Sequence, residues 1–236
     1  MPGRDSYQKQ NLVESFNSWD YRYSQTKQLW TWRSDSKLMQ YFDLVKKGNV
    51  LDLGIGEGRN SLPFAMNGFS IDGVDISATA LNRCKESFNS RNLPVNLVVG
   101  DLRKFIIERN KYTLIIAANV LNFFSGSDIK ALLKQIKSGI QDGGSIYLSV
   151  FSTLDPKFQA MKESRAKIEE NTFYDDEKKL YIHFFAREQL LNCFREFELI
   201  CCCEGIEYDN EANNPHYHGI IEILVRKKVL SKQKKD

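Results

Sequence analysis

The chain has 236 residues and a formal net charge of +3, and 42% of its residues are hydrophobic and 27% charged. These values are typical of a soluble globular protein, and five cysteines, three of them consecutive, exclude a secreted disulfide framework. No apolar run approaches the ~20 residues that span a membrane, and the N-terminus lacks the apolar core of a signal peptide. We therefore expect a cytoplasmic protein without a membrane partner.

Residues 1–45 form an aromatic-rich segment that includes Trp19, Tyr23 and Trp30. Apolar residues at helical spacing predict a helix near residues 36–45. We interpret the segment as an N-terminal helical cap. Its aromatic side chains either wall a pocket or anchor the segment to the core, and the sequence favours neither.

Strands and helices are predicted to alternate through a single domain, residues 46–228, which a basic tail, residues 229–236, follows. The apolar pattern predicts strands at 49–53, 70–74, 95–99, 113–118, 145–151, 199–208 and 219–226. It predicts helices at 59–67 and 186–194, a helix that begins after a Ser77 cap, and a helix from a Ser127-Asp128 cap to Gly143-Gly144. An irregular insertion is expected at about 155–180. Alternation of this kind indicates an α/β fold with a mostly parallel sheet and helices on both faces. The last two strands have no helix between them and should pair antiparallel.

The most informative motif follows the first predicted strand. An acid, Asp52, ends an apolar run, and Gly54, Gly56 and Gly58 alternate after it. Glycines without a Cβ let the backbone approach a ligand, and a turn that leads into a helix N-terminus is typical of nucleotide binding. A dinucleotide fingerprint needs glycine or alanine where this chain has Arg59.

The pattern acid-x-Gly-x-Gly-x-Gly resembles motif I of the class I S-adenosylmethionine (SAM) methyltransferases. The resemblance implies a Rossmann-like, seven-stranded, mostly parallel sheet whose last strand is antiparallel. It also implies that Asp52 and the glycine backbone bind the methionine part of SAM.

Three further sites follow the ends of later strands, where open α/β sheets bind ligands. The resemblance implies that Asp75 binds both ribose hydroxyls, since a carboxylate has two acceptor oxygens, and that Ile76 lies against the adenine. It implies that Asp101 and the backbone of Leu102 bind the adenine edge, and that Asn119 lies in the motif IV region beside the methyl group. The alternatives are that the two acids only cap helices and that the asparagine only forms a loop.

Two segments narrow the resemblance to a subset that includes the tellurite-resistance methyltransferases. They are Trp19-Asp20-Tyr21-Arg22-Tyr23 and Gly58-Arg59-Asn60-Ser61, in which Asn60 is a further candidate for cofactor contact. The chain departs from the tellurite enzymes at Ile55 and Glu57. It departs again at Asn214-Pro215-His216-Tyr217-His218, where those enzymes have a His-Arg pair.

Methyl transfer from SAM needs in-line placement of a nucleophile and exclusion of water, so no catalytic triad is expected. His216 and His218 would share one face of a strand and are the candidate catalytic residues, with a surface pair as the alternative. Arg33 is a candidate for binding the SAM carboxylate. No metal site is predicted.

We therefore predict a SAM-dependent methyltransferase that acts on a small molecule and releases S-adenosylhomocysteine. A SAM-binding regulator without turnover, a nucleotide-dependent oxidoreductase, and an RNA or protein methyltransferase stay open as alternatives. A nucleic-acid substrate is disfavoured because the body of the chain has no recurring basic stripe and no Asn-Pro-Pro-Tyr motif. The sequence fixes neither the acceptor atom nor the oligomeric state.

Overall fold

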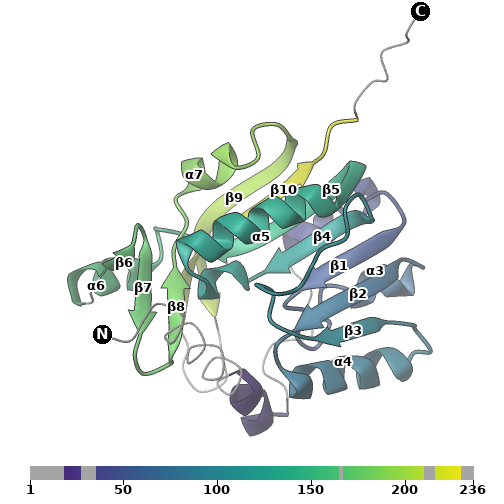
Figure 1. Cartoon of the computed structure of the whole chain (residues 1–236), viewed down its shortest axis with the longest axis horizontal. Helices are drawn as coiled ribbons and strands as arrows, with labels where there is room; N and C mark the ends of the chain where they lie inside the picture. Colours follow the sequence, from purple (N-terminus) through teal and green to yellow (C-terminus); the bar gives the residue numbers. More distant parts are fainter. Residues whose placement is uncertain (1–18, 28–35, 165–166, 210–215, 230–236) are drawn as a thin grey trace, which may run out of the picture.

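A computed structural model describes residues 19–27, 36–164, 167–209 and 216–229 of the chain. Its main sheet has seven strands in the order β3-β2-β1-β4-β5-β10-β9, and a second sheet has three in the order β6-β7-β8. Figure 1 shows the small sheet beside one end of the large one, toward which the strands β1, β2 and β4 point.

The main sheet is parallel except at one strand. Its members are β1 (Asn49–Leu53), β2 (Ser70–Asp75), β3 (Asn96–Val99), β4 (Tyr112–Ala118), β5 (Ile140–Phe151), β9 (Glu198–Asp209) and β10 (His216–Arg226). The last strand, β10, lies between β5 and β9 and is antiparallel to both. The predicted fold class, with its single antiparallel strand, is confirmed.

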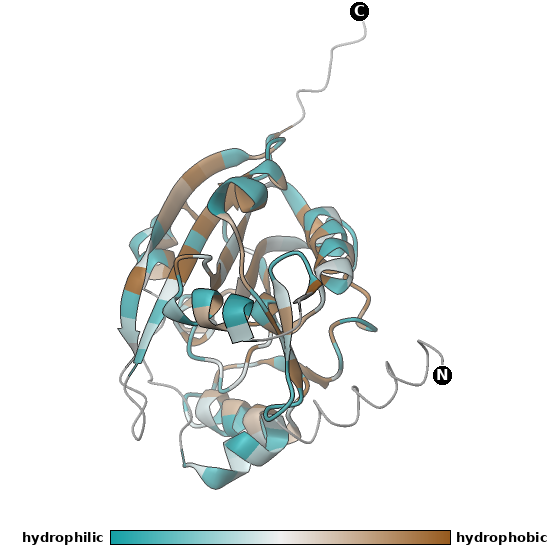
Figure 2. Cartoon of the chain, turned by 90° about the vertical axis from the view of Figure 1, so that its left-hand side faces the viewer, coloured by the Kyte–Doolittle hydropathy of each residue, from teal (hydrophilic) through white to brown (hydrophobic). Residues whose placement is uncertain are grey.

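Helices cover both faces of this sheet. They are α2 (Ser36–Gln40), α3 (Leu62–Met66), α4 (Ala78–Asn89), α5 (Gly126–Gly139) and α7 (Arg187–Asn192), with short 3-10 turns η1 (Phe42–Leu44) and η2 (Leu121–Phe123). Apolar side chains of α5 and α7 pack on one face, and those of α2, α3 and α4 pack on the other. Figure 2 shows hydrophilic and hydrophobic residues alternating along the helices, as expected when one side of each is buried.

Three predicted boundaries are wrong for identifiable reasons. The helix after the glycine turn begins at Leu62 rather than residue 59, because the turn extends to its N-cap residue, Ser61, whose hydroxyl donates to Asp52. The cap of α5 is Ser125, two residues before the predicted Ser127, because the Ser125 hydroxyl accepts from the backbone N–H of Asp128. That helix ends at Gly139, and β5 starts at the next residue and runs through the glycine pair that was expected to end the helix.

The insertion predicted to be irregular is instead structured. It contains α6 (Pro156–Ser164), β6 (Lys167–Glu169), β7 (Thr172–Asp175) and β8 (Leu180–His183). A separate apolar cluster supports it, built on Phe173, Leu180, Ile182 and Phe184, and Trp19 packs against this cluster. Strands of three or four residues carry too few alternating positions to be recognised from their pattern.

No helix in the described ranges is both long and apolar enough to cross a membrane.

Candidate functional site

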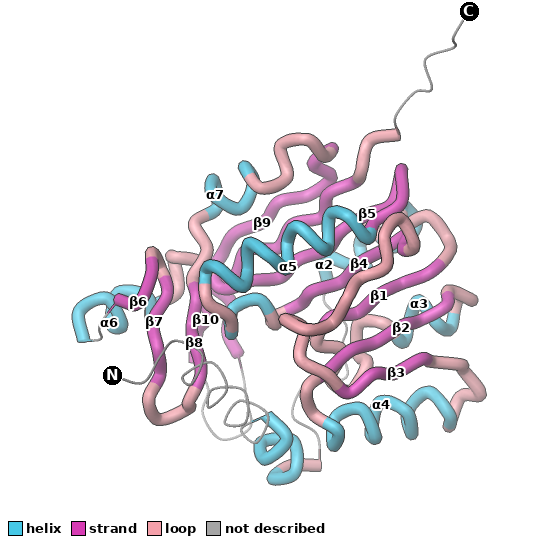
Figure 3. The backbone as a smooth tube through the Cα atoms, viewed as in Figure 1, coloured by secondary structure: helices cyan, strands magenta, loops and turns pink. Residues whose placement is uncertain are grey.

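A cavity of about 1330 Å³, its open mouth included, lies at the carboxyl ends of β1, β2 and β4. Figure 3 shows the loops that follow these strands on the side of the large sheet that faces the β7–β8 hairpin. The predicted cofactor residues that line this cavity are Asp52, Gly54, Gly56, Asn60, Asp75, Ile76, Asp101, Leu102 and Asn119. Strand ends of a parallel sheet have thus brought together residues that lie up to 67 positions apart in the sequence, since Asp52 and Asn119 both contribute.

The turn after β1 has the conformation that its glycines predict. Gly54, Gly56 and Gly58 have φ angles of 72°, 55° and 85°, which favour glycine. A Cβ on Gly56 would lie 2.7 Å from the Tyr23 hydroxyl oxygen. The bare backbone therefore keeps this part of the cavity wall open.

Gly58, also a predicted cofactor residue, lies differently from the other two glycines, and its role in binding stays a prediction. It is not among the residues that line the cavity. A Cβ there would lie 2.8 Å from the Cys84 sulfur and 2.8 Å from a ring carbon of Phe88, both on α4. This glycine lets α4 pack against the turn.

Asp75 ends β2, and both of its carboxylate oxygens already accept a backbone hydrogen bond. Gly56 N–H donates to Oδ2 and Ser77 N–H donates to Oδ1, each at 2.9 Å. Burial raises the pKa of this carboxyl above its usual value, against the opposing effect of these N–H donors. Each oxygen keeps a second acceptor position, so the side chain can still accept from a ligand diol.

Asp101 follows β3 and pairs with Arg103, a residue that the sequence reasoning missed. The Arg103 Nε lies 3.0 Å from each Asp101 oxygen, and its Nη2 lies 2.9 Å from Oδ2. Arg103 also lines the cavity, and its guanidinium lies over the ring of Phe124 at 5.9 Å. The spacing of two residues between acid and arginine was the available signal.

Asn119 occupies a strained position at the end of β4. Its φ is +54°, in the left-handed region that asparagine tolerates better than most residues. Its backbone N–H donates to Ser149 O at 2.8 Å, and its Oδ1 accepts from the Ser149 hydroxyl at 3.3 Å. The alternative that this residue only forms a loop is thus compatible with its conformation, but its side chain also borders the cavity.

The N-terminal residues 19–25 are helical and close one side of the cavity. Asp20 accepts from the Ser77 hydroxyl at 2.7 Å and from Thr79 N–H at 2.9 Å, which adds a second cap to α4. Arg83 of α4 reaches back to the carbonyls of Tyr23 and Thr26 at 2.6 and 2.5 Å. Polar contacts at both ends therefore fix this segment over the glycine turn.

The β7–β8 hairpin closes another side. Tyr174, Lys179, Leu180 and Tyr181 line the cavity, and the two tyrosine rings meet edge-to-face at 5.4 Å. The sequence predicted an insertion here, without naming these side chains. Desolvation raises the pKa of Tyr181.

His216 and His218, the predicted catalytic pair, lie at the start of β10 and share a face. Their Nε2 atoms are 2.7 Å apart, and His218 Nδ1 is 3.0 Å from Oδ2 of the fully buried Asp155 side chain. His218 stacks on Phe151 at 4.8 Å. Neither histidine is among the described residues that line the cavity, so a catalytic role stays a prediction.

Two other predictions concern Arg33 and metal ions. Arg33, the candidate for the SAM carboxylate, lies outside the described residues. Among the described residues, no group of three or more His, Cys, Asp or Glu side chains could hold a metal ion.

Comparison with known proteins shows which family this chain resembles. Residues 50–144 match the family model of a methyltransferase domain. Over this part of its length the chain is similar to a methyltransferase domain. The predicted resemblance to the SAM-dependent methyltransferases is therefore confirmed.

The curated relatives agree with this resemblance. The probable SAM-dependent methyltransferase TehB of Haemophilus influenzae is 26% identical over 113 residues, which are 48% of this chain and 39% of the relative. The carboxy-S-adenosyl-L-methionine synthase of Haemophilus ducreyi is 33% identical over 119 residues, or 48% of each chain. The chain thus matches less than half the length of these two curated relatives, so their reactions do not carry over to it.

Solved structures share the fold. The crystal structure of Haemophilus influenzae TehB has a TM-score of 0.66 at 20% identity and covers 82% of this chain and 62% of its own. The 1,6-didemethyltoxoflavin-N1-methyltransferase of Burkholderia thailandensis has a TM-score of 0.65 at 14% identity and covers 97% and 92%. At these identities the likeness concerns the α/β architecture.

Proposed function

We propose that this protein binds SAM in the cavity and transfers its sulfonium methyl group to a small-molecule acceptor. The observation that carries the proposal is that the glycine turn, Asp75, Asp101 and Asn119 all line one cavity. Each alone could be a cap or a turn. Their convergence on one space is what a ligand with a polar chain, a diol and a base would need.

The residues of this cavity fit the cofactor. The wall at Gly56 is a backbone surface that a Cβ would fill, as its 2.7 Å approach to the Tyr23 hydroxyl indicates. In the proposed assignment Asp75 accepts from the ribose hydroxyls with the lone pairs that its backbone donors leave free. Asp101 accepts from the adenine amino group and also forms an ion pair with Arg103. Ile76 and Leu102 present apolar surface to the base.

The methionine end is assigned to the glycine turn. Asp52 is buried and accepts from the Ser61 hydroxyl at 2.6 Å, which holds its carboxylate in place. Asn60 is buried beside it and also lines the cavity. Arg33 keeps its proposed role with the carboxylate of the cofactor.

When bound, SAM supplies a methyl group that its positive sulfur already activates. The chain then has to orient the acceptor in line with the breaking carbon–sulfur bond and to exclude water. The N-terminal helical cap and the β7–β8 hairpin supply that closure, since Trp19, Tyr23, Tyr174 and Tyr181 line the cavity from these two segments. The electron pair of the broken bond stays on sulfur, which leaves neutral S-adenosylhomocysteine.

A base is required only for an acceptor that arrives protonated. His216 and His218 remain the candidates for that task, and ring contacts lead from His218 through Phe151 to Phe123 on the cavity wall. The proposal does not depend on them, because an acceptor that is already anionic or has a free lone pair needs no base.

The test is transfer of labelled methyl groups from SAM. The purified protein is incubated with isotopically labelled SAM and, separately, with small-molecule, RNA and protein fractions of a cell extract. We expect label and S-adenosylhomocysteine to appear with the small-molecule fraction, and Asp75→Ala to abolish both while its circular dichroism is unchanged. Label in the RNA or protein fraction would contradict the small-molecule acceptor, and SAM binding without transfer to any fraction would favour a regulator.

A further inference from the structure

Beyond the residues assigned to the cofactor, the cavity wall is largely aromatic. Trp19 and Tyr23 come from the N-terminal helix, Phe123 and Phe124 from η2 and the residue after it, and Tyr174 and Tyr181 from the β7–β8 hairpin. Five of these six rings are only partly buried, Tyr23 being the exception. Three segments far apart in the sequence thus present rings to one space.

These rings are arranged in edge-to-face pairs. Trp19 and Phe123 meet at 4.9 Å with their planes 68° apart, and Tyr174 and Tyr181 meet at 5.4 Å with planes 70° apart. Edge-to-face pairing is one of the two arrangements that aromatic rings prefer, and a flat ligand ring can pair with such a wall in the same way. Aromatic contacts contribute beyond the area they bury, so such a wall selects a planar ring over an aliphatic one of equal size.

The charge of the wall points to a second property of the ligand. Each carboxylate that lines the cavity already has a donor: Asp52 has Ser61, Glu57 has Arg83, Asp75 has two backbone N–H groups, and Asp101 has Arg103. Lys179 also lines the cavity, and it forms no hydrogen bond or ion pair with any part of the chain that the structure describes. Its charge is therefore available to a ligand.

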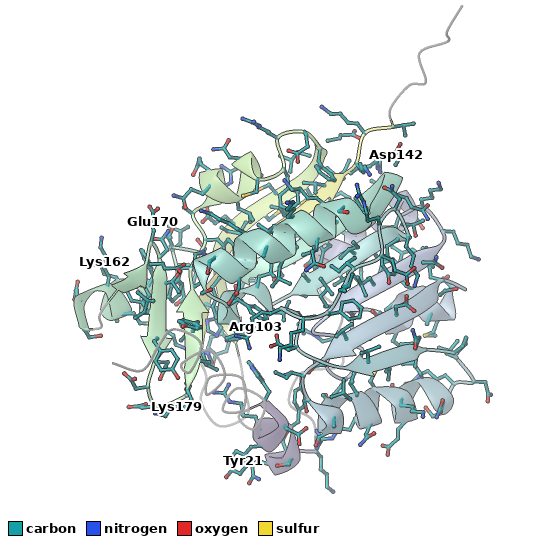
Figure 4. All side chains as sticks on the ribbon, in the orientation of Figure 1. Tyr21, Arg103, Asp142, Lys162, Glu170 and Lys179 are labelled. Atoms are coloured by element: carbon teal, nitrogen blue, oxygen red, sulfur yellow. The ribbon has the colours of Figure 1, made fainter. Side chains whose placement is uncertain are left out.

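The position of this lysine is set by the hairpin. Asp175 Oδ1 accepts from the N–H groups of Glu177 and Lys178 at 3.1 Å each, and Lys179 then adopts a φ of +55° before β8 begins. Figure 4 shows Lys179 at the tip of the hairpin, with Arg103 nearer the centre of the molecule. Lys179 thus borders the cavity from the hairpin, whereas the cofactor residues border it from the strand ends of the large sheet.

We infer that the methyl acceptor is a planar aromatic or heteroaromatic molecule that carries a carboxylate or similar anionic group. The inference rests on the proposed function, since it assigns the cofactor to the other half of the cavity. The rings of the three segments hold the flat acceptor, and Lys179 binds its anionic group. A lone pair on the acceptor forms the new bond to the methyl carbon while the carbon–sulfur bond breaks and its electrons remain on sulfur.

The test uses three matched probes and protein saturated with S-adenosylhomocysteine, so that the adenine site is filled. The probes are 4-hydroxybenzoate, phenol, which lacks the carboxylate, and trans-4-hydroxycyclohexanecarboxylate, which lacks the aromatic ring. We expect calorimetry to give an affinity for 4-hydroxybenzoate at least about tenfold higher than for either of the others.

Lys179→Gln separates the anion site from the rest of the cavity. We expect it to weaken 4-hydroxybenzoate binding about threefold to tenfold, as for the loss of a partly exposed ion pair, and to leave the affinities for phenol and S-adenosylhomocysteine unchanged. Lys162→Gln, the same change on the exposed face of α6, is the matched control and should alter nothing.

Three results would overturn the inference. One is equal binding of the aromatic and the alicyclic carboxylate, a second is absence of binding by all three probes, and a third is equal behaviour of Lys179→Gln and Lys162→Gln. Protein that binds S-adenosylhomocysteine but gives any of these results leaves the proposed function standing. Protein that does not bind S-adenosylhomocysteine refutes the proposed function and the inference together.

Discussion

The contact that most directly controls closure of the site is the one between Arg83 and the N-terminal helix. Arg83 Nη1 pairs with Glu57 at 3.0 Å, and its Nη2 donates to the carbonyls of Tyr23 and Thr26. Glu57 belongs to the glycine turn and its side chain is only 6% exposed. One guanidinium therefore joins α4, the glycine turn and the segment that carries Trp19.

Arg83→Met keeps much of the side chain's apolar length and removes all three contacts. A hydrogen bond to a charged group contributes about 1.5–3 kcal/mol where it is buried, but two of these contacts are partly exposed and Asp20 still anchors the other end. We therefore expect closure to weaken by about 1.5–3 kcal/mol. If the closed form is the one that binds, the apparent dissociation constant of S-adenosylhomocysteine rises in proportion to the lost closed population, by about tenfold or more.

The assay is calorimetric titration with S-adenosylhomocysteine, together with chymotrypsin cleavage at the aromatic residues of the N-terminal helix. Arg91→Met is the control, because Arg91 lies just after α4 and its side chain hydrogen-bonds, within the described ranges, only to Ser87 and Ser90. Arg83→Met should bind more weakly and be cut faster than the control. Equal affinity and equal cleavage in the two variants would refute the view that this arginine holds the site closed.

Three further predictions follow from single residues. Gly56→Ala should weaken S-adenosylhomocysteine binding at least about tenfold in calorimetry, because the new Cβ would clash with Tyr23 and because the φ of residue 56 is +55°. Gly205→Ala, whose Cβ would have no atom within 4 Å, should bind normally. Equal effects of the two substitutions would contradict the assigned turn. Burial lowers the pKa of His183 to about 4, so as the pH falls the unfolded chain binds this proton before the folded chain does. The free energy of unfolding should therefore be highest above pH 6.5 and fall by up to about 3 kcal/mol toward pH 4. Urea titrations of His183→Gln should lack this loss. Hydrogen bonds from a ribose diol would lower the raised pKa of Asp75, so the affinity for S-adenosylhomocysteine should fall as the pH drops through that pKa. Binding near that pH should release a proton. An affinity that does not change over this pH range would contradict the ribose assignment.

Much of the large sheet could be predicted from sequence because its signals are local. The strand β4 is apolar throughout, as a strand buried on both faces must be, and Ser77 caps α4 where the pattern predicts it. The order of the cofactor residues along the chain also survives folding, since each follows a strand that ends at the same edge of the sheet. That is why one glycine turn and three later acids or amides were enough to locate the cavity.

The parts that could not be predicted depend on contacts between distant residues. Arg83 is 26 positions from Glu57 and 60 from Tyr23, and nothing in the local pattern of α4 indicates either contact. Asp155 joins His218 across 63 positions, a contact beside Phe151 that the local pattern does not indicate. The aromatic wall arises in the same way, because short strands in the insertion bring Tyr174 and Tyr181 to a space that β4 and the N-terminal helix also border.

The central claim is that the cavity binds SAM, and calorimetry with SAM, S-adenosylhomocysteine and NADH tests it most directly. The account predicts micromolar binding of the first two and none of NADH, since Arg59 stands where a dinucleotide turn needs a small residue. Binding of NADH without SAM would mean that the glycine turn serves another nucleotide. It would contradict the assignments of Asp75 and Asp101, and the proposed reaction with them.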